Sequence, residues 1–172
     1  METKHVVVVP YDPQWSLEFL KIKNKLEPIL GNCIVAIEHV GSTAVNGLAA
    51  KPIIDIDIII ESYSVFEIVK TRLAISGYIH EGDLGIKDRE AFKYQNKPEL
   101  MTHHLYVCPQ DSAELKRHLL FRQYLTTHDR ERDAYGELKL ELAKRFPYDI
   151  ESYMEGKNHF INSILDKCET SI

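Results

Sequence analysis

Apolar residues recur along this chain in the two rhythms that distinguish β-strands from α-helices. Runs rich in β-branched and other apolar residues, some with polar residues at alternate positions, are typical of strands. They predict six strands, the first at a sheet edge, over residues 6–9, 33–40, 53–60, 78–80, 89–94 and 101–108. Because only the polar residues 95–100 separate the last two runs, we expect these two strands to pair.

Apolar residues three or four positions apart predict helices between and after the strands. The first would cover residues 15–30, with Asp12 as its cap. A second would run from Ser62 to about residue 75, and a short helical turn is expected within residues 43–50. Three more are expected near the end of the chain, over residues 111–125, 130–145 and 150–167.

This order of elements predicts an α+β (α/β) fold, with strands in the first two thirds and only helices in the last third. The chain has 172 residues and shows no linker, repeat or low-complexity segment, so we expect a single domain over residues 1–172. The helical tail begins at about residue 111. About 60 residues would make a marginal domain alone, so we expect the tail to pack on the sheet.

Composition narrows the class of protein further. Hydrophobic residues make up 44% of the chain and charged residues 27%, as in soluble globular proteins. The net charge of −5 makes non-specific binding of nucleic acid unexpected. The three cysteines are far apart, which indicates a reducing cytoplasm rather than disulfides or zinc. We expect neither a secretory leader nor a membrane span, because no apolar run is long enough.

The strongest chemical signal is the pair of acids within the isoleucine-rich strand of residues 53–60. Side chains alternate along a strand, so Asp55 and Asp57 share one face while their isoleucine neighbours face a core. Two adjacent carboxylates repel each other unless a cation neutralises them, and a divalent metal ion would do so. The preceding loop, Gly41-Ser42-Thr43, offers backbone N–H groups to a phosphate. The competing interpretation is that these are strand-end acids exposed to solvent.

These residues resemble the signature of the nucleotidyltransferase superfamily. That pattern reads here as Val40-Gly41-Ser42, twelve further residues, and then Asp55-Ile56-Asp57-Ile58. More narrowly, residues 39–56 resemble the hallmark of the GrpB family, with its His-Val-Gly-Ser-Thr and Ala-Lys-Pro-Ile-Ile-Asp segments. The likeness extends over nearly the whole chain, including the segments Tyr-Asp-Pro-Gln-Trp at 11–15 and Thr-His-His-Leu-Tyr at 102–106.

The resemblance implies a nucleotidyltransferase-like mixed β-sheet flanked by helices, and a nucleoside triphosphate or other small phosphorylated ligand. Asp55 and Asp57 would be catalytic and would hold Mg²⁺ or Mn²⁺. The nucleotide would lie against Gly41, Ser42 and Thr43. Because some members of the family are fused to a dephospho-coenzyme A kinase, the resemblance also implies a link to that enzyme.

Nucleotidyltransferases usually add a third carboxylate from a neighbouring strand, and this chain departs from that pattern. The strand predicted over residues 101–108 contains no acid and offers His103 or His104 instead. His104 would share a face with Tyr106, where the family more often has a second histidine. This leaves open a one-metal site, a histidine-assisted site with His104 as a catalytic residue, and a protein that has lost catalysis.

Basic residues offer candidates for phosphate binding. Lys51 precedes the acidic strand, and Arg89 and Lys93 share a face of the strand predicted over residues 89–94. They would clamp a phosphate, although a solvated strand face explains the last two equally well. Three further cations lie on predicted helices, where we expect surface or salt-bridge roles: Arg122, Lys139 and Lys157.

The sequence thus predicts an enzyme that moves a nucleotidyl group from a nucleoside triphosphate to an unknown acceptor, using Mg²⁺. A non-catalytic module that binds a nucleotide or assists a partner is the first alternative, because the third acid is missing. A metal-dependent phosphate-ester hydrolase is the second, and it requires His104 to lie within reach of the metal ion.

Overall fold

The structure is a computed structural model that describes residues 5–170. The predicted domain, residues 1–172, extends beyond this range at both ends. Residues 1–4, which belong to the segment where no leader is expected, also lie outside it. The helices are α1 (Gln14–Leu30), α2 (Phe66–Ile75), α3 (Ala113–Thr127), α4 (Asp129–Arg145) and α5 (Ile150–Thr170). The strands are β1 (Ala36–Val40), β2 (Ile54–Ile60), β3 (Ile79–Gly82), β4 (Glu90–Lys93) and β5 (His103–Pro109). No described helix has both the length and the apolar content needed to cross a membrane.

The five strands form one mixed sheet, as the resemblance implied. Their order is β1-β2-β5-β4-β3, and β2 runs parallel to β5 while the other neighbouring pairs are antiparallel. The expected pairing of β4 with β5 is confirmed. β2 is the strand that the isoleucine and aspartate pattern predicted, and it lies between β1 and β5.

The strand predicted over residues 6–9 is wrong. This segment makes only one bridge, between Val9 and Ala50, and is otherwise extended chain. Val6 is buried against Leu142 and Tyr153 of the C-terminal helices. The apolar run therefore reflects burial under helices rather than pairing in the sheet.

Two shorter predictions also need correction. The strand expected over residues 33–40 begins only at Ala36, because Gly31–Cys33 form a 3₁₀ turn after α1. The helical turn expected within residues 43–50 is the 3₁₀ turn η2, Ser42–Ala44. Another 3₁₀ turn, η3 (Tyr63–Val65), precedes α2, and the Ser62 side chain accepts a hydrogen bond from Ser64 N there.

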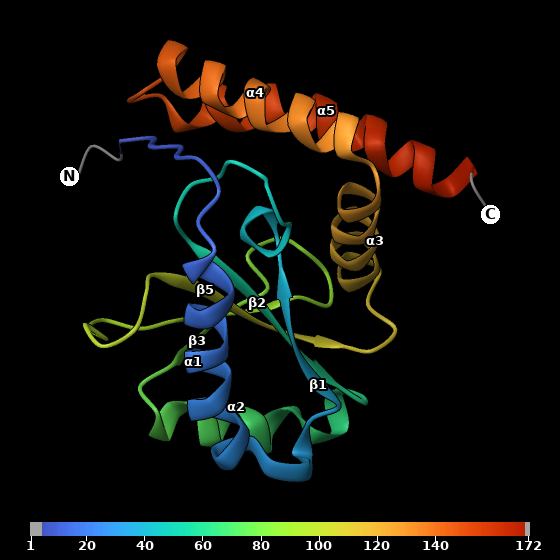
Figure 1. Cartoon of the computed structure of the whole chain (residues 1–172). Helices are drawn as coiled ribbons and strands as arrows, with labels where there is room; N and C mark the ends of the chain where they lie inside the picture. Colours follow the sequence, from blue (N-terminus) through green and yellow to red (C-terminus); the bar gives the residue numbers. More distant parts are fainter. Residues whose placement is uncertain (1–4, 171–172) are drawn as a thin grey trace.

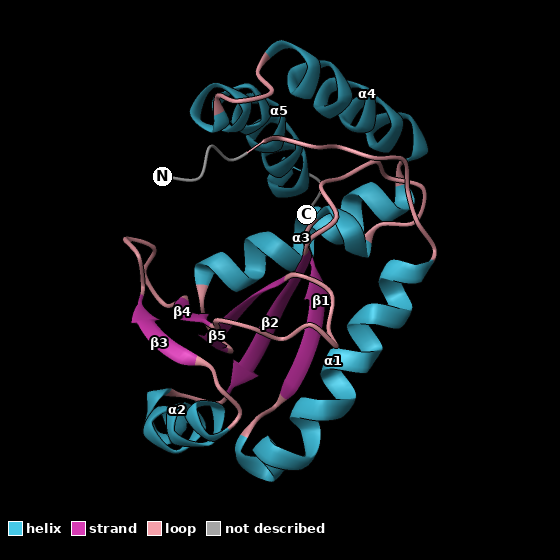
Figure 2. Cartoon of the chain, turned by 90° about the vertical axis from the view of Figure 1, so that its left-hand side faces the viewer, coloured by secondary structure: helices cyan, strands magenta, loops and turns pink. Residues whose placement is uncertain are grey.

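The main core lies between one face of the sheet and the helices α1 and α2. Ile54, Ile56 and Ile58 are fully buried on this face of β2, as the alternation predicted. Trp15 on α1 is only 2% exposed and belongs to the same core. In Figure 2, α1 and α2 lie beside the sheet, and α4 and α5 lie above it. Burial of this isoleucine face therefore turns the two aspartates toward the opposite side.

The helical tail packs on the sheet through its first helix, α3. Only α3 covers the second face, where Leu115 contacts Ile59 and Cys108. α4 and α5 form a pair beyond the end of the sheet (Figure 1), and they pack on α3 and on the loop between β1 and β2. The space between the sheet and this helical pair is where the polar residues gather.

Candidate functional site

The two acids of β2 lie side by side on the face of the sheet opposite the isoleucine core. The parallel register with β5 places His104 beside Asp55 and Tyr106 beside Asp57. The strand that was expected to complete the site therefore presents an imidazole and a phenol where a third carboxylate would lie. His103 points to the other face, as strand alternation requires.

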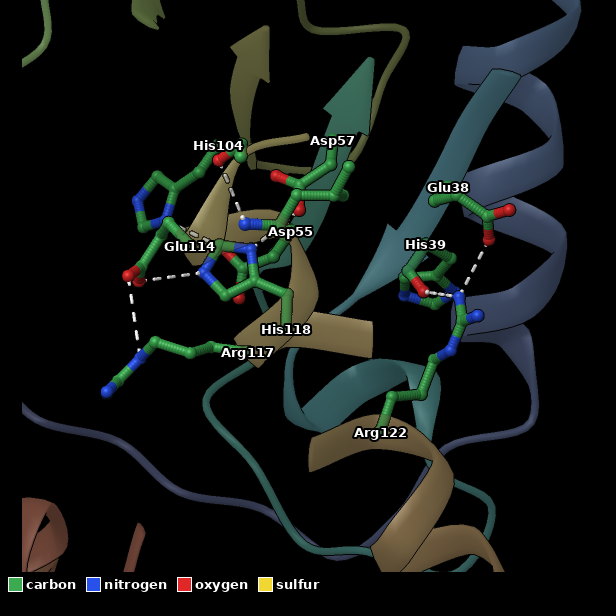
Figure 3. A network of polar contacts seen from close by, with 11 residues as sticks. Glu38, His39, Asp55, Asp57, His104, Glu114, Arg117, His118 and Arg122 are labelled. Carbon is green, nitrogen blue, oxygen red and sulfur yellow. Dashed lines mark hydrogen bonds and ion pairs between the residues drawn. The ribbon is translucent and has the colours of Figure 1, made fainter. Parts of the chain in front are cut away.

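Each acid is hydrogen-bonded to a different histidine (Figure 3). The Nδ1 atom of His104 lies 2.9 Å from Oδ1 of Asp55. The Nδ1 atom of His118, on α3, lies 2.6 Å from Oδ2 of Asp57, and its Nε2 atom lies 3.2 Å from Oε1 of Glu114. His118 thus sits between two carboxylates, one from the sheet and one from its own helix.

This position controls the charge of His118. Burial lowers the pKa of the imidazole, but the hydrogen bond and charge of Asp57, with help from Glu114, outweigh burial and raise the pKa above its ordinary value. A carboxylate only accepts hydrogen bonds, so both ring nitrogens must carry a proton for both contacts to form. The cationic imidazole offsets part of the charge that Asp57 brings into the protein, where this side chain has no exposed surface.

The loop after β1 passes close to Asp55. Gly41 has a φ of 75° and a ψ of −172°, a conformation open essentially to glycine alone. A Cβ atom at this position would collide with the Asp55 carboxylate. A bare backbone at position 41 therefore lets the Gly41-Ser42 segment lie directly beside the acid.

Thr43 and His39 hold this loop in place. The Nε2 atom of His39 lies 2.9 Å from Oγ1 of Thr43, and the His39 ring stacks on Phe19. Burial lowers the pKa of His39 to about 4, so this imidazole is neutral near pH 7. Arg122 on α3 binds both Glu38 and the backbone oxygen of His39, at 2.8 and 2.7 Å (Figure 3). The salt-bridge role expected for Arg122 is confirmed.

A cavity of about 280 Å³ opens between the sheet and the helical pair. Seven of the nine residues proposed for the site from sequence line it: Gly41, Ser42, Thr43, Lys51, Asp55, Arg89 and His104. Asp57 lies behind this lining and reaches it through His118. Lys93 lies at the exposed end of β4, outside the lining.

Lysines approach the cavity from the helices as well as from the loop before β2. Lys51 and Lys157 both stand over the Tyr153 ring, with their Nζ atoms 5.4 and 5.0 Å from its centre. Lys139 stands over the Tyr135 ring at 4.4 Å and is 1% exposed. All three lysines line the same cavity as Asp55.

Burial and neighbouring positive charges lower the pKa values of Lys139 and Lys157. Burial, together with the charges of Lys157 and Lys51, lowers the pKa of Lys139 to about 6. Burial and the charge of Lys51 lower the pKa of Lys157 to about 8. The surface roles expected for Lys139 and Lys157 are therefore wrong, because both side chains turn inward from their helices.

Arg89 lies at the rim of the cavity on the β4 side. Its guanidinium stacks over the Tyr106 ring, 4.3 Å from the ring centre. Its Nε atom is buried and, among the side chains that the structure describes, has no hydrogen-bond partner. Tyr106 thus holds an arginine beside the two acids.

The acid pair has the donor chemistry that Mg²⁺ requires. One oxygen of each aspartate is bound to a histidine, whereas the buried Oδ1 atom of Asp57 lacks a hydrogen-bond partner among the described residues. Residues 5–170 contain no group of three or more His, Cys, Asp or Glu side chains placed to share an ion. Mg²⁺ commonly takes one or two carboxylates and completes its shell with water and substrate phosphates, so this pair fits that ion.

His103, the alternative candidate on β5, has a structural position. It is 3% exposed, its Nε2 atom lies 2.8 Å from the Tyr78 hydroxyl, and its ring stacks on Tyr94. Burial lowers its pKa. His104 is therefore the histidine of this strand that faces the site.

Sequence reasoning missed His118 and Glu114, and it misassigned Lys139. The signal for Lys139 was present, since Tyr135, Lys139 and Leu142 follow helical spacing and two of them are apolar. Such a stripe predicts that the lysine between the apolar residues is buried. His118 lies four residues after Glu114, but nothing local indicates that α3 covers the acidic strand.

Solved structures confirm the class of fold. The chain is similar to the Cid1 poly(U) polymerase with MgGTP bound, with a TM-score of 0.56 and 15% identity over 79% of this chain and 44% of that chain. At this identity the likeness shows the fold alone, which is nucleotidyltransferase-like. A GrpB protein from Enterococcus faecalis has a TM-score of 0.84 at 34% identity, over 96% of this chain and 98% of that chain.

The chain belongs to the GrpB family, whose model, described as GrpB protein, matches residues 5–167. The glutamate-rich protein GrpB of Alkalihalophilus pseudofirmus is 35% identical over 94% of this chain and 95% of that protein. YqkA of Bacillus subtilis is 34% identical, and the chain spans 46% of its length. A dephospho-CoA kinase of Mycolicibacterium paratuberculosis is 27% identical, over 88% of this chain and 43% of that protein.

Proposed function

We propose that this protein transfers a nucleotidyl group from a nucleoside triphosphate to an acceptor, with Mg²⁺ or Mn²⁺ held by Asp55 and Asp57. The observation that carries the proposal is the composition of the cavity. One wall presents Asp55, with the buried Oδ1 atom of Asp57 behind it and without a hydrogen-bond partner among the described residues. The helices opposite present lysines. A metal ion and the phosphates it binds would complement both walls at once.

Solved structures with this fold support the choice of ligand. Cid1, which shares the fold, has been solved in complex with MgGTP and with the UTP analog UMPNPP. The glycine at position 41 leaves room for a phosphate beside the acids, and backbone N–H groups of such a loop suit an anion. We also propose a link to coenzyme A metabolism, because a dephospho-CoA kinase of Mycolicibacterium paratuberculosis is 27% identical over 88% of this chain.

Several roles in the reaction follow from the geometry. Asp55 and Asp57 would hold the metal ion, which when bound would supply positive charge to offset that of the phosphates. His118 is a positioning residue, because it fixes the orientation of Asp57 through a 2.6 Å contact. His104 fixes Asp55 in the same way from β5. The backbone at Gly41 and Ser42 would orient the phosphates, and Arg89 would contribute a fixed positive charge at the rim.

A screen of the four nucleoside triphosphates with Mg²⁺ or Mn²⁺ tests the proposal directly. We expect release of pyrophosphate, which Asp55→Ala abolishes and Asp111→Asn, at an exposed acid outside the cavity, leaves unchanged. The absence of turnover with every triphosphate would count against the proposal. Release of orthophosphate instead of pyrophosphate would favour the phosphate-ester hydrolase with His104.

The second candidate function is a non-catalytic module that binds a nucleotide or assists a partner. It is favoured by the register of β5, which places His104 and Tyr106 where a third carboxylate would lie. This alternative predicts nucleotide binding that survives Asp57→Asn without any turnover in the wild type. Loss of binding in that variant would argue for the metal-dependent enzyme.

We also retain a cytoplasmic location in the proposal. The support is chemical, since Cys33, Cys108 and Cys168 are all present as free thiols. Unpaired thiols are typical of a reducing compartment.

A further inference from the structure

The cavity contains a cluster of three lysines, Lys51, Lys139 and Lys157. The three side chains come from separate parts of the chain: the loop before β2, helix α4 and helix α5. Their Nζ atoms lie over two aromatic rings, those of Tyr135 and Tyr153. The fold therefore brings three amines together, and their positive charges repel one another when they are protonated.

Lys139 is the member of the cluster that is buried most deeply. Its side chain is 1% exposed, and its Nζ atom has no hydrogen-bond partner among residues 5–170. An amine in this position loses its hydration, and its contact with the Tyr135 ring supplies no hydrogen-bond acceptor oxygen in return. Because the residue also lines the cavity, a ligand in the cavity can supply the missing partner.

We propose that Lys51, Lys139 and Lys157 bind the terminal phosphates of a polyphosphate chain, and that the phosphates bring a proton onto the Lys139 amine. The inference rests on the proposed function only for the choice of a polyphosphate as the ligand. A single orthophosphate would satisfy fewer lysines than a chain of linked phosphates. The site therefore selects triphosphates by the charge at their far end.

The proton uptake follows from the neighbours of Lys139. The groups that face it are Lys157 and Tyr153 of α5, Tyr135 of its own helix, Lys51, and Asp55 of β2. Of these, the two lysines disfavour a charged amine and Asp55 favours it. Phosphate oxygens would add negative charge and accept hydrogen bonds, so they reverse the balance and a proton enters from solvent.

Calorimetry of inorganic tripolyphosphate binding, with a chelator and no metal ion, measures both parts of the proposal. We choose pH 7, above the pKa of Lys139 and below that of Lys157, and two buffers with different ionisation enthalpies. The wild type should take up about one proton more per ligand than Lys139→Met, because the free amine is mostly neutral at this pH. Lys139→Met should also bind about tenfold more weakly, the loss expected for one hydrogen bond to a charged group.

Matched variants separate the cluster from general charge effects. Lys144→Met removes an exposed lysine from the same helix outside the cavity, and should change neither affinity nor proton uptake. Lys157→Met should weaken binding and also reduce the proton uptake, because the loss of its charge raises the pKa of the free Lys139 amine. This variant also covers the case that Lys139→Met does not fold. Tripolyphosphate itself also exchanges protons when it binds. This contribution cancels when the proton uptake of a variant is subtracted from that of the wild type.

Three results would overturn the inference. They are no binding of tripolyphosphate to the wild type, equal binding and proton uptake by Lys139→Met, and orthophosphate binding as tight as that of tripolyphosphate. The proposed function fails separately. Tripolyphosphate binding with proton uptake, but no turnover of any triphosphate, would retain the lysine site and reject the transferase. Triphosphate turnover that Lys139→Met leaves unchanged would retain the transferase and reject the lysine site.

Discussion

Gly41 and Lys139 are each held in a state that an isolated residue would avoid. Gly41 adopts a backbone conformation that side chains disfavour, beside the Asp55 carboxylate. The Lys139 amine is buried away from water and has no hydrogen-bond partner among the described residues. Both conditions are met at the walls of one cavity, which indicates that the surrounding fold supplies the free energy to maintain them for binding.

Replacing Gly41 with alanine should damage both stability and function. The strained backbone and the collision with Asp55 should lower the unfolding free energy by about 1–3 kcal/mol, measured by urea denaturation. Gly85→Ala is the matched control, since Gly85 also has a positive φ but a Cβ atom there meets nothing within 4 Å. A loss of nucleotide binding as large in Gly85→Ala as in Gly41→Ala would contradict this prediction.

Lys139→Met should make the protein more stable and change its pH dependence. The pKa of Lys139 is about 6 in the folded state and near 10.5 when unfolded, so between these values the unfolded chain binds more protons. The wild type should therefore gain stability as the pH rises above 6, by up to about 1.4 kcal/mol per pH unit from this residue. Unfolding free energies measured across pH 6–9 should show a smaller slope in Lys139→Met.

At the scale of elements, the strand β2 and the helix α3 make different contributions to the site. β2 buries isoleucines on one face and presents Asp55 and Asp57 on the other, so a single alternating pattern builds both core and site. α3 lies over that acidic face and supplies His118 from its second turn. The position of α3 depends on how it begins, directly after β5.

Ser112 caps the start of α3, because its side chain accepts a hydrogen bond from Leu115 N at 3.2 Å. Ser112→Ala should lower the unfolding free energy by about 1 kcal/mol. Since the first turns of α3 hold Glu114 and His118, the same change should also weaken nucleotide binding or turnover. Ser62→Ala, at a cap remote from the cavity, should affect stability alone. Equal effects of both variants on binding would argue against this role for α3.

At the scale of the whole molecule, the cavity needs both halves of the chain. The acids and the glycine loop come from the sheet region, whereas His118, Lys139 and Lys157 come from the helical tail. α4 and α5 are held to the rest through the loop between β1 and β2, for example by Arg132 and the backbone oxygen of Asn46. A ligand in the cavity would therefore join parts that are far apart in sequence.

A non-hydrolysable triphosphate with Mg²⁺ should raise the thermal unfolding midpoint of the whole protein. At a hundredfold excess over its dissociation constant, a ligand stabilises the folded state by about 2.7 kcal/mol, or roughly 5–10 °C for a chain of this size. Scanning calorimetry would measure the shift. The nucleoside without phosphates should give none, and Asp55→Ala should reduce it. An equal shift with the nucleoside would place recognition in the base rather than the phosphates.

The sequence predicts this molecule well wherever the signal is local. Alternation along β2 gave its core face and its acidic face, and Gly41 followed from the loop before it. The site positions of His118 and Lys157 could not be predicted, because they depend on how the helices pack and no neighbouring residue in the sequence indicates that packing. The strand predicted from the apolar run at residues 6–9 is wrong for the same reason, since Val6 is buried under helices rather than in a sheet.

The unpartnered amine of Lys139 has a consequence for how relatives of this protein change over generations. A buried lysine lowers the stability of every molecule that carries it, and the proposed ligand role would account for its retention. On this proposal, a relative that no longer binds the ligand would gain stability from leucine or methionine at this position. The residue at this one position in α4 would then distinguish relatives that use the cavity from those that do not.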